Sequence, residues 1–175
     1  MLAKNTHSLK ILVMKTCLFF IICFLTINIS QAQLTTTPVC PPFSVDVLDG
    51  NVNKIYPKST WAEVKTKFPC YSQLIESDSA SVCAGVFYTE KGIYFYTDRD
   101  YIEIRENFKG KMFPSLLGAS RSSLFATLGY PKIKDVHWDA FQTEYGTLIL
   151  YYNKAGKINK IQISSKTTDV IKLCN

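Results

Sequence analysis

Two matching stretches of sequence, FYTEKG (residues 87–92) and FQTEYG (residues 141–146), decide the predicted fold. Both fit the pattern F-x-T-E-x-G, and their first residues lie 54 positions apart (141 − 87). A short helical pattern precedes each stretch, in residues 60–68 and 120–128, at a nearly equal offset. A unit of helix and strands that occurs twice predicts a tandem architecture, and duplicated sheets readily provide broad binding surfaces.

The two predicted helices carry start and stop signals. Thr60 and Glu63 form a capping-box pattern, apolar residues follow at helical spacing, and Pro69 ends the segment. The second helix, residues 120–128, ends at Gly129. We therefore expect a helix in front of each group of strands.

Short segments rich in Tyr, Phe, Ile and Val follow each helix and predict strands. The expected strands are residues 86–89, 92–97, 100–105, 138–143, 147–153 and 157–164, with polar turns between neighbours. Three strands cannot bury a face alone, so the preceding helix is the natural cover. The prediction is an α+β fold made of two tandem repeats, each a helix followed by an antiparallel three- to four-stranded meander. The two sheets can join edge to edge with the helices on one face.

The beginning of the chain has the pattern of a secretory signal peptide. Lys10 and Lys15 flank an apolar run at residues 16–25, and a small-x-small site ending at Ala32 predicts cleavage there. The run is shorter than a typical membrane-spanning helix, and it lacks a lipoprotein cysteine. Met14 is an alternative start. We therefore expect a periplasmic or secreted protein without a membrane anchor.

The expected organisation has five segments. These are a signal peptide (1–32), a Thr/Pro-rich lead-in (33–43), a first repeat (44–105), a connector (106–119) and a second repeat with a C-terminal tail (120–175). The formal net charge falls from +6 to +3 (6 − 3) when three lysines leave with the signal peptide. Acidic and basic residues alternate without a basic run, so nucleic acid is not an expected partner.

The cysteines predict a disulfide-bonded protein. Four cysteines follow the signal peptide, and an even number in an exported chain indicates disulfides. Of the three pairings that four cysteines allow, we expect Cys70–Cys83, which closes a short loop, and Cys40–Cys174, which ties the two ends together. The chain has no C-x-x-C motif, and His137 is the single histidine beyond the signal peptide, so no metal or cofactor is expected.

The second predicted helix resembles a family signature. Residues 118–131, GASRSSLFATLGYP, are similar to the G-x-[ST]-x-x-x-[VL]-x-x-x-L-G-x-P helix of the β-lactamase-inhibitor-protein-like superfamily. Residues 152–158, YNKAGKI, are similar to that family's last hairpin, and residues 58–69 are a looser match without the L-G step. The resemblance implies a tandem fold but no single function, because the superfamily includes both inhibitors and envelope-assembly lipoproteins. No binding residue carries over, because the loops do not align.

The tyrosines of the first predicted meander form the main candidate binding surface. If the helices cover the aliphatic face, alternation along the strands leaves the other face open. The predicted contact residues are Tyr88, Tyr94, Tyr96, Tyr101 and Arg105, with Asp98 and Arg99 at the adjoining hairpin tip. Tyr and Arg are frequent anchors of protein interfaces. The alternative is structural, because tyrosine suits half-exposed strands and aspartate favours turns.

A second candidate is an acid–base cluster of Asp135, His137 and Asp139. The alternative is that a lone histidine beside Trp138 serves packing or lies on the surface. No nucleophile elbow, zinc-protease helix, phosphate-binding loop or dinucleotide-binding fingerprint occurs in the chain.

The leading hypothesis is an exported protein-binding module that is not an enzyme. An inhibitor or immunity protein acting on an envelope-targeted enzyme or toxin fits the signal peptide, the duplicated unit and the tyrosine-rich face. The alternative is a periplasmic scaffold for envelope assembly or a small-ligand-binding protein. A hydrolase using the acid–base cluster is the third hypothesis.

Overall fold

The computed structural model of the 175-residue chain describes residues 38–76 and 83–174. The predicted signal peptide and the first part of the predicted lead-in lie outside these ranges. Among the helices of the described ranges, none has the length and apolar character needed to cross a membrane.

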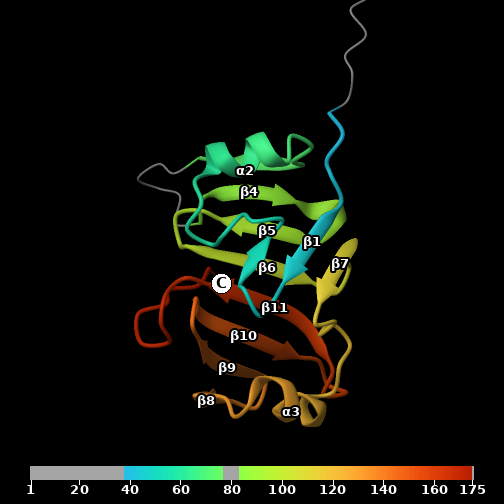
Figure 1. The fold of residues 1–175 in the computed structure, drawn as a ribbon, viewed down its shortest axis with the longest axis vertical. Coiled ribbons are helices and arrows are strands. Elements are labelled where there is room, and N and C mark those ends of the chain that lie inside the picture. The colour runs from blue at the N-terminus through green and yellow to red at the C-terminus, as the bar shows by residue number, and fades with distance from the viewer. Residues whose placement is uncertain (1–37, 77–82, 175) are drawn as a thin grey trace, which may run out of the picture. The chain divides into compact units, whose positions relative to one another are not determined.

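The largest element is an eight-stranded antiparallel sheet, which dominates the view in Figure 1. Its strands, in spatial order, are β3 (Gln73–Ile75), β4 (Gly85–Tyr88), β5 (Ile93–Tyr96), β6 (Tyr101–Arg105), β11 (Ile158–Ser164), β10 (Gly146–Tyr152), β9 (Trp138–Thr143) and β8 (Ile133–Lys134). Two sequential groups of strands meet at the β6–β11 pair, where Ile104 lies opposite Ile161. All six predicted strand segments are confirmed, because each matches one of these strands to within one residue at either end.

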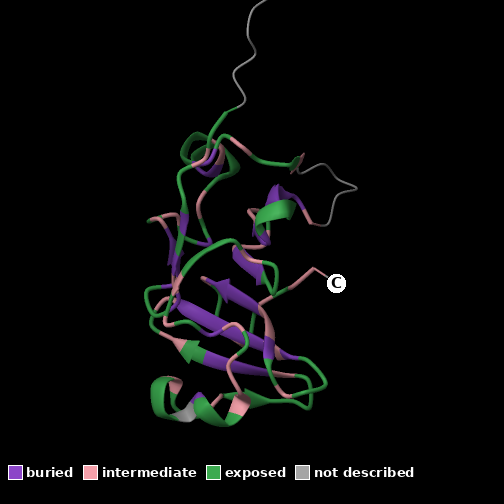
Figure 2. Cartoon of the chain, turned by 90° about the vertical axis from the view of Figure 1, so that its right-hand side faces the viewer, coloured by how far each residue is buried: buried purple, intermediate pink, exposed green. Residues whose placement is uncertain are grey.

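A smaller sheet lies across one face of the large sheet (Figure 1). It contains β2 (Asn51–Val52), β1 (Phe43–Asp46) and β7 (Gly110–Phe113), with β1 parallel to β7. Its valines and Phe43 belong to the same hydrophobic cluster as the aliphatic residues of the large sheet. Burial is concentrated in the strands, whereas the helices carry many exposed residues (Figure 2). The small sheet therefore covers a face of the large sheet for which the sequence predicts helices as the cover.

The predicted α+β fold of helix-and-sheet repeats is wrong, because the protein is mostly β. The second predicted helix is reduced to a 3-10 turn, η2 (Arg121–Ser123), and the four-residue α3 (Phe125–Leu128). Ser123 Oγ donates a hydrogen bond to the Ser120 carbonyl at 2.7 Å, and such local bonds compete with the helical ladder. The predicted connector, in turn, contributes the strand β7.

The two F-x-T-E-x-G stretches are not structurally equivalent. Phe87 lies opposite Tyr94 on one face of the large sheet, whereas Phe141 lies opposite Leu148 in the core on the other face. The first stretch continues into the 3-10 turn η1 (Thr89–Lys91), while the second continues along β9 into a tighter turn. Since strand side chains alternate between faces, a shift of one residue is enough to reverse the direction of every side chain.

The first predicted helix is confirmed as α2 (Trp61–Lys67). Thr60 Oγ1 accepts a hydrogen bond from the Glu63 amide, and Glu63 Oε2 accepts one from the Thr60 amide at 2.7 Å, which completes the capping box. Phe68, just past the helix, packs against Phe43 with ring centroids 4.5 Å apart. The helix is thus attached to the core at its C-terminal end.

The four cysteines of the described residues form two disulfides, but the predicted pairing is wrong. Cys40 bonds Cys70 and Cys83 bonds Cys174, with Cα–Cα distances of 5.4 and 5.9 Å. Both distances lie in the range that a disulfide spans without backbone movement. The lead-in is therefore tied to the end of α2, and the C-terminal tail is tied to the start of β4.

Candidate functional site

The candidate site lies on the face of the large sheet opposite the core, which we call the outer face. A line of cross-strand neighbours runs over four strands on this face: Arg105 of β6, Lys160 of β11, Tyr151 of β10 and Trp138 of β9. We call these four residues the exposed row, because all four are accessible to solvent: Arg105 is exposed, and the other three are half-buried. Cross-strand neighbours on one face lie within side-chain contact, so the row forms a continuous surface.

Two cations of the row lie over aromatic rings. The Lys160 ammonium is 3.9 Å from the ring centroid of Tyr151, and the Arg105 guanidinium carbon is 4.0 Å from that of Tyr94. Such cation–π contacts hold long, flexible side chains against the sheet. The row is therefore more ordered than a set of surface lysines and arginines would be.

A buried carboxylate organises the row from below. Glu103, whose side chain is only 4% exposed, accepts a hydrogen bond from Arg105 Nε at 2.6 Å and another from Gln162 Nε2 at 2.7 Å. Gln162 Oε1 in turn accepts a hydrogen bond from the Tyr151 hydroxyl at 2.9 Å. Buried polar groups are costly unless they are paired, and this network pairs each of them.

Lys160 differs from Arg105 in its relation to this network. Its ammonium lies 3.9 Å from Glu103 Oε2, which is an ion-pair distance but too long for a hydrogen bond. Both oxygens of Glu103 already accept shorter hydrogen bonds. The ammonium therefore keeps donor capacity for a group outside the protein.

A cavity of about 260 Å³ lies next to the exposed row, between the sheet and the C-terminal tail. Its lining is mostly apolar: Ile133, Trp138, Ala140, Thr147, Ile149, Tyr151, Thr168, Ile171 and Leu173. The sheet contributes one side of this lining, and the tail contributes Thr168, Ile171 and Leu173.

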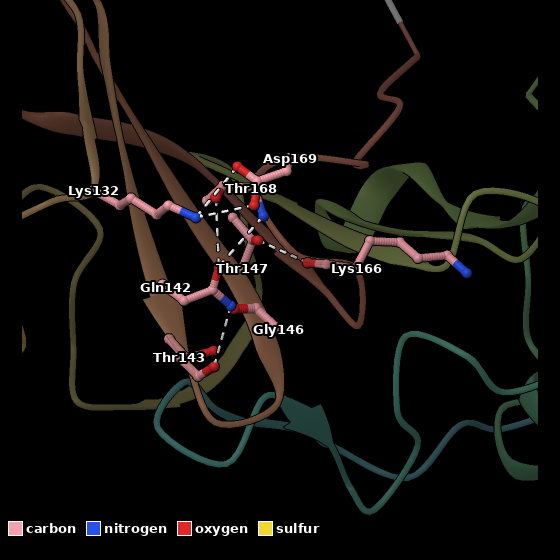
Figure 3. A network of polar contacts seen from close by, with 8 residues as sticks. All are labelled: Lys132, Gln142, Thr143, Gly146, Thr147, Lys166, Thr168 and Asp169. Carbon is pink, nitrogen blue, oxygen red and sulfur yellow. Dashed lines mark hydrogen bonds and ion pairs between the residues drawn. The ribbon is translucent and has the colours of Figure 1, made fainter.

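Polar contacts hold the tail in place over the sheet (Figure 3). The Thr147 hydroxyl donates a hydrogen bond to the Lys166 carbonyl at 2.7 Å, and the Lys132 ammonium lies 3.1 Å from the Asp169 carboxylate. The disulfide to Cys83 fixes the far end of the tail. The tail wall of the cavity is therefore anchored at several points.

A second, more open hollow of about 420 Å³ lies on the other side of Tyr151. Its lining is polar and charged: Arg105, Glu106, Asn107, His137, Tyr151, Tyr152, Asn159 and Lys160. Tyr151 lines both spaces, so the apolar cavity and the charged hollow adjoin at this residue.

Burial raises the pKa of six of the ten tyrosines. They are Tyr88, Tyr96, Tyr101, Tyr145, Tyr151 and Tyr152, and desolvation is the largest cause for each. For Tyr151 the shift brings the pKa to about 12, with a smaller contribution from the Glu103 carboxylate. Its hydroxyl therefore stays protonated and keeps its hydrogen bond to Gln162 at physiological pH.

Three predicted contact residues, Tyr88, Tyr94 and Tyr101, are buried and do not lie on an open surface. Tyr88 lies in the core on the opposite face, where its hydroxyl donates a hydrogen bond to the Phe68 carbonyl at 2.6 Å. Tyr101 is on the outer face but completely buried, and its hydroxyl accepts a hydrogen bond from the Cys174 amide. Tyr88 pairs with Ile93, and this register places its side chain on the core face. Tyr101 is buried because the C-terminal tail covers it.

Tyr94 and the remaining predicted contact residues lie at or near the outer face. Tyr94 is buried beneath Arg105, and Tyr96 is half-buried and stacked on Tyr101 at 4.5 Å. The hairpin tip carries an ion pair between Arg99 and Asp98 at 3.6 Å. Of the predicted set, Arg105 alone belongs to the exposed row.

Sequence reasoning missed the other three members of the row. Trp138, Tyr151 and Lys160 come from the second group of strands. The 54-residue offset between the two F-x-T-E-x-G stretches was misleading there, because it aligns leucines with the tyrosines of the first group. The useful signal was alternation within residues 147–153, which places Tyr151 on the face opposite Leu148 and Leu150.

The predicted acid–base cluster is not assembled as a unit. Asp139 is fully buried on the core face, where both carboxylate oxygens accept hydrogen bonds from Arg121 and one also accepts the Tyr152 hydroxyl at 2.8 Å. Asp135 accepts a hydrogen bond from the His137 backbone amide at 3.0 Å. Within residues 38–76 and 83–174, no group of three or more His, Cys, Asp or Glu side chains could hold a metal ion.

No protein-family model, curated protein or solved structure matches this chain.

Proposed function

We propose that the protein is an exported binding module, not an enzyme, whose exposed row contacts another protein. The observation that carries this proposal is the row itself: Arg105, Lys160, Tyr151 and Trp138 side by side on one face, fixed from below by the buried Glu103. Tyr, Trp and Arg are enriched among the residues that contribute most to protein–protein affinity.

The order of the row supports a binding role. Association normally costs side-chain entropy, roughly 0.5–1.5 kcal/mol for each long side chain that becomes immobilised. The cation–π contacts and the Glu103 network restrict Arg105 and Lys160 before a partner arrives. A partner that contacts the row therefore loses less affinity to ordering.

The finer part of the proposal is that the partner is an envelope-targeted enzyme or toxin, which the protein inhibits or to which it confers immunity. Two disulfides agree with an oxidising compartment, where such a partner would act. A positively charged surface row also fits a partner with an acidic cleft.

The test uses the protein exported from the full chain and purified with both disulfides formed. Envelope extract and culture supernatant are passed over immobilised wild-type protein, Trp138→Ala and Lys160→Met, and captured proteins are identified by mass spectrometry. Trp61→Ala is the matched control, because Trp61 is 49% exposed on α2 and lies outside the row.

A partner held by wild type and Trp61→Ala but lost by both row variants supports the proposal, and an assay of that partner's activity then tests inhibition. A partner held equally by all four proteins would place the interface elsewhere. Capture of no protein by wild type would overturn the protein-binding role.

A further inference from the structure

We infer that the apolar cavity and the Lys160 ammonium form one composite site, which takes an aromatic or branched aliphatic side chain of the partner together with a neighbouring carboxylate. This inference rests on the proposed function and names the chemistry of the partner segment. The connecting element is Tyr151, which lines the cavity and also lies beneath the ammonium of Lys160.

The size of the cavity favours a single side chain. Pockets for whole small-molecule ligands usually measure roughly 300–1,000 Å³, whereas an apolar cavity of roughly 150 Å³ already accommodates benzene. At about 260 Å³, this cavity has room for one ring with its connecting atoms. Interface anchors commonly fill a pocket of this kind on the opposing protein.

The cavity offers few hydrogen-bonding groups to an occupant. The Thr147 hydroxyl already donates to the Lys166 carbonyl, and the Thr168 hydroxyl lies within reach of Gln142. The remaining lining is apolar or aromatic. An occupant with a polar tip would therefore lose hydrogen bonds on entry, and an apolar group would not.

Charge at the mouth selects a carboxylate for the second contact. Lys160 and Arg105 both lie near one buried carboxylate, that of Glu103, and Arg105 makes the shorter contact. Arg105 is hydrogen-bonded to Glu103, and Glu106 is the acidic residue that lines the adjoining hollow, so Lys160 supplies the positive charge next to Tyr151. An anion next to Tyr151 can accept a hydrogen bond from the ammonium without displacing another partner.

The direct test uses phenylacetate as a probe, with phenylacetamide as its neutral isostere and acetate as the anion without a ring. Binding to the oxidised protein is followed by amide chemical shifts in NMR titrations to millimolar concentration. Phenylacetate should bind at least about tenfold more tightly than either control, because each control lacks one of the two contacts. Shifts should centre on Ile149, Tyr151 and Leu173.

Paired variants separate the two halves of the site. Lys160→Met should bring phenylacetate affinity down to that of phenylacetamide, whereas Lys154→Met in the exposed β10–β11 turn should not change it. Leu173→Ala should weaken both aromatic probes, whereas Val170→Ala, on the same tail but 61% exposed, should weaken neither. Ala140→Leu fills the cavity from the sheet side, so it should also weaken both aromatic probes and thereby check the result for Leu173→Ala.

Failure of this inference differs from failure of the proposed function. Equal binding of phenylacetate and phenylacetamide, or shifts outside the cavity, would overturn the composite site even if a protein partner is captured through the row. Selective phenylacetate binding by a protein that captures no partner would instead identify a free amphipathic carboxylate as the ligand and overturn the protein anchor. Selective binding that competes with a captured partner supports the inference in full.

Discussion

Removal of the arginine from the Arg121–Asp139 pair should destabilise the protein strongly. The Asp139 side chain is 1% exposed, and it accepts hydrogen bonds from Arg121 and from the Tyr152 hydroxyl. Arg121→Met keeps much of the arginine stem but leaves the carboxylate with one donor. Removing one partner of a buried ion pair usually costs about 3–5 kcal/mol, because the remaining charge is buried without compensation.

The expected cost lies at the lower end of this range. Arg121 is 25% exposed on its side chain, so water can reach part of the vacated space. Tyr152 also remains as a donor. We therefore expect a loss of about 3 kcal/mol in the free energy of unfolding, equivalent to a fall of roughly 6–12 °C in Tm for a domain of this size.

The assay is urea unfolding at pH 7, monitored by circular dichroism and tryptophan fluorescence with both disulfides intact. The midpoint should fall while the m-value stays constant, which indicates a change of stability without a change of the surface exposed on unfolding. A triple variant, Arg121→Met with Asp139→Leu and Tyr152→Phe, replaces the whole network by apolar groups. Its stability should recover to within about 1 kcal/mol of wild type, because no buried charge remains.

Two results would refute this reasoning. A loss below about 1 kcal/mol for Arg121→Met would mean that Asp139 is solvated and that its burial has little energetic effect. A triple variant as unstable as the single variant would mean that the cost comes from lost packing and not from an uncompensated carboxylate.

Three further predictions concern the disulfides, the turns and the tyrosines. Cys83→Ala with Cys174→Ala opens a loop of sequence separation 91, against 30 for the other bridge, and should cost about 4–5 kcal/mol, roughly 1 kcal/mol more than opening that bridge. Urea unfolding of the two double variants checks this, and the reverse order of stabilities would contradict the loop-closure account. Gly50→Ala should cost about 1–3 kcal/mol more than Gly156→Ala, because both glycines have nearly the same positive φ, but only Gly50 lies against a tyrosine ring. Equal Tm values for the two variants would show that the ring moves aside freely. Because burial raises the pKa of six tyrosines, the unfolded state loses these protons first, so these tyrosines should not change stability below pH about 10 and should lower it as the pH rises above that value. Tyrosinate absorbance recorded with circular dichroism tests this, and simultaneous titration of all ten tyrosines without loss of structure would contradict it.

Local signals in the sequence predicted the strands and the first helix well. The capping box of Thr60 and Glu63 depends on neighbours three residues apart, and it is present as expected. The hairpin turns likewise depend on a few adjacent residues. Such features are predictable because the interactions that determine them lie within one turn of the chain.

Non-local pairing is what the sequence could not show. The strand β7 exists because Gly110–Phe113 pairs with β1, more than sixty positions earlier, and nothing within the segment itself indicates this partner. The burial of Tyr101 depends on a tail that a distant disulfide holds. The candidate site was therefore predicted only where alternation alone was sufficient, as for Arg105.

The order of the two disulfides has a consequence for biogenesis. Among the four cysteines that follow the predicted signal peptide, each pairs with its neighbour in the order in which they leave a ribosome or a translocation channel: Cys40 with Cys70, then Cys83 with Cys174. An oxidase that joins each free thiol to the next one to arrive would produce the native bonds directly. The nested pairing that the sequence predicts would instead require Cys40 to stay reduced until Cys174 is available. A Cys40–Cys70 bond that formed earlier would then have to be broken by thiol–disulfide exchange. Maturation of this protein should therefore proceed with a disulfide oxidase alone and need no isomerase.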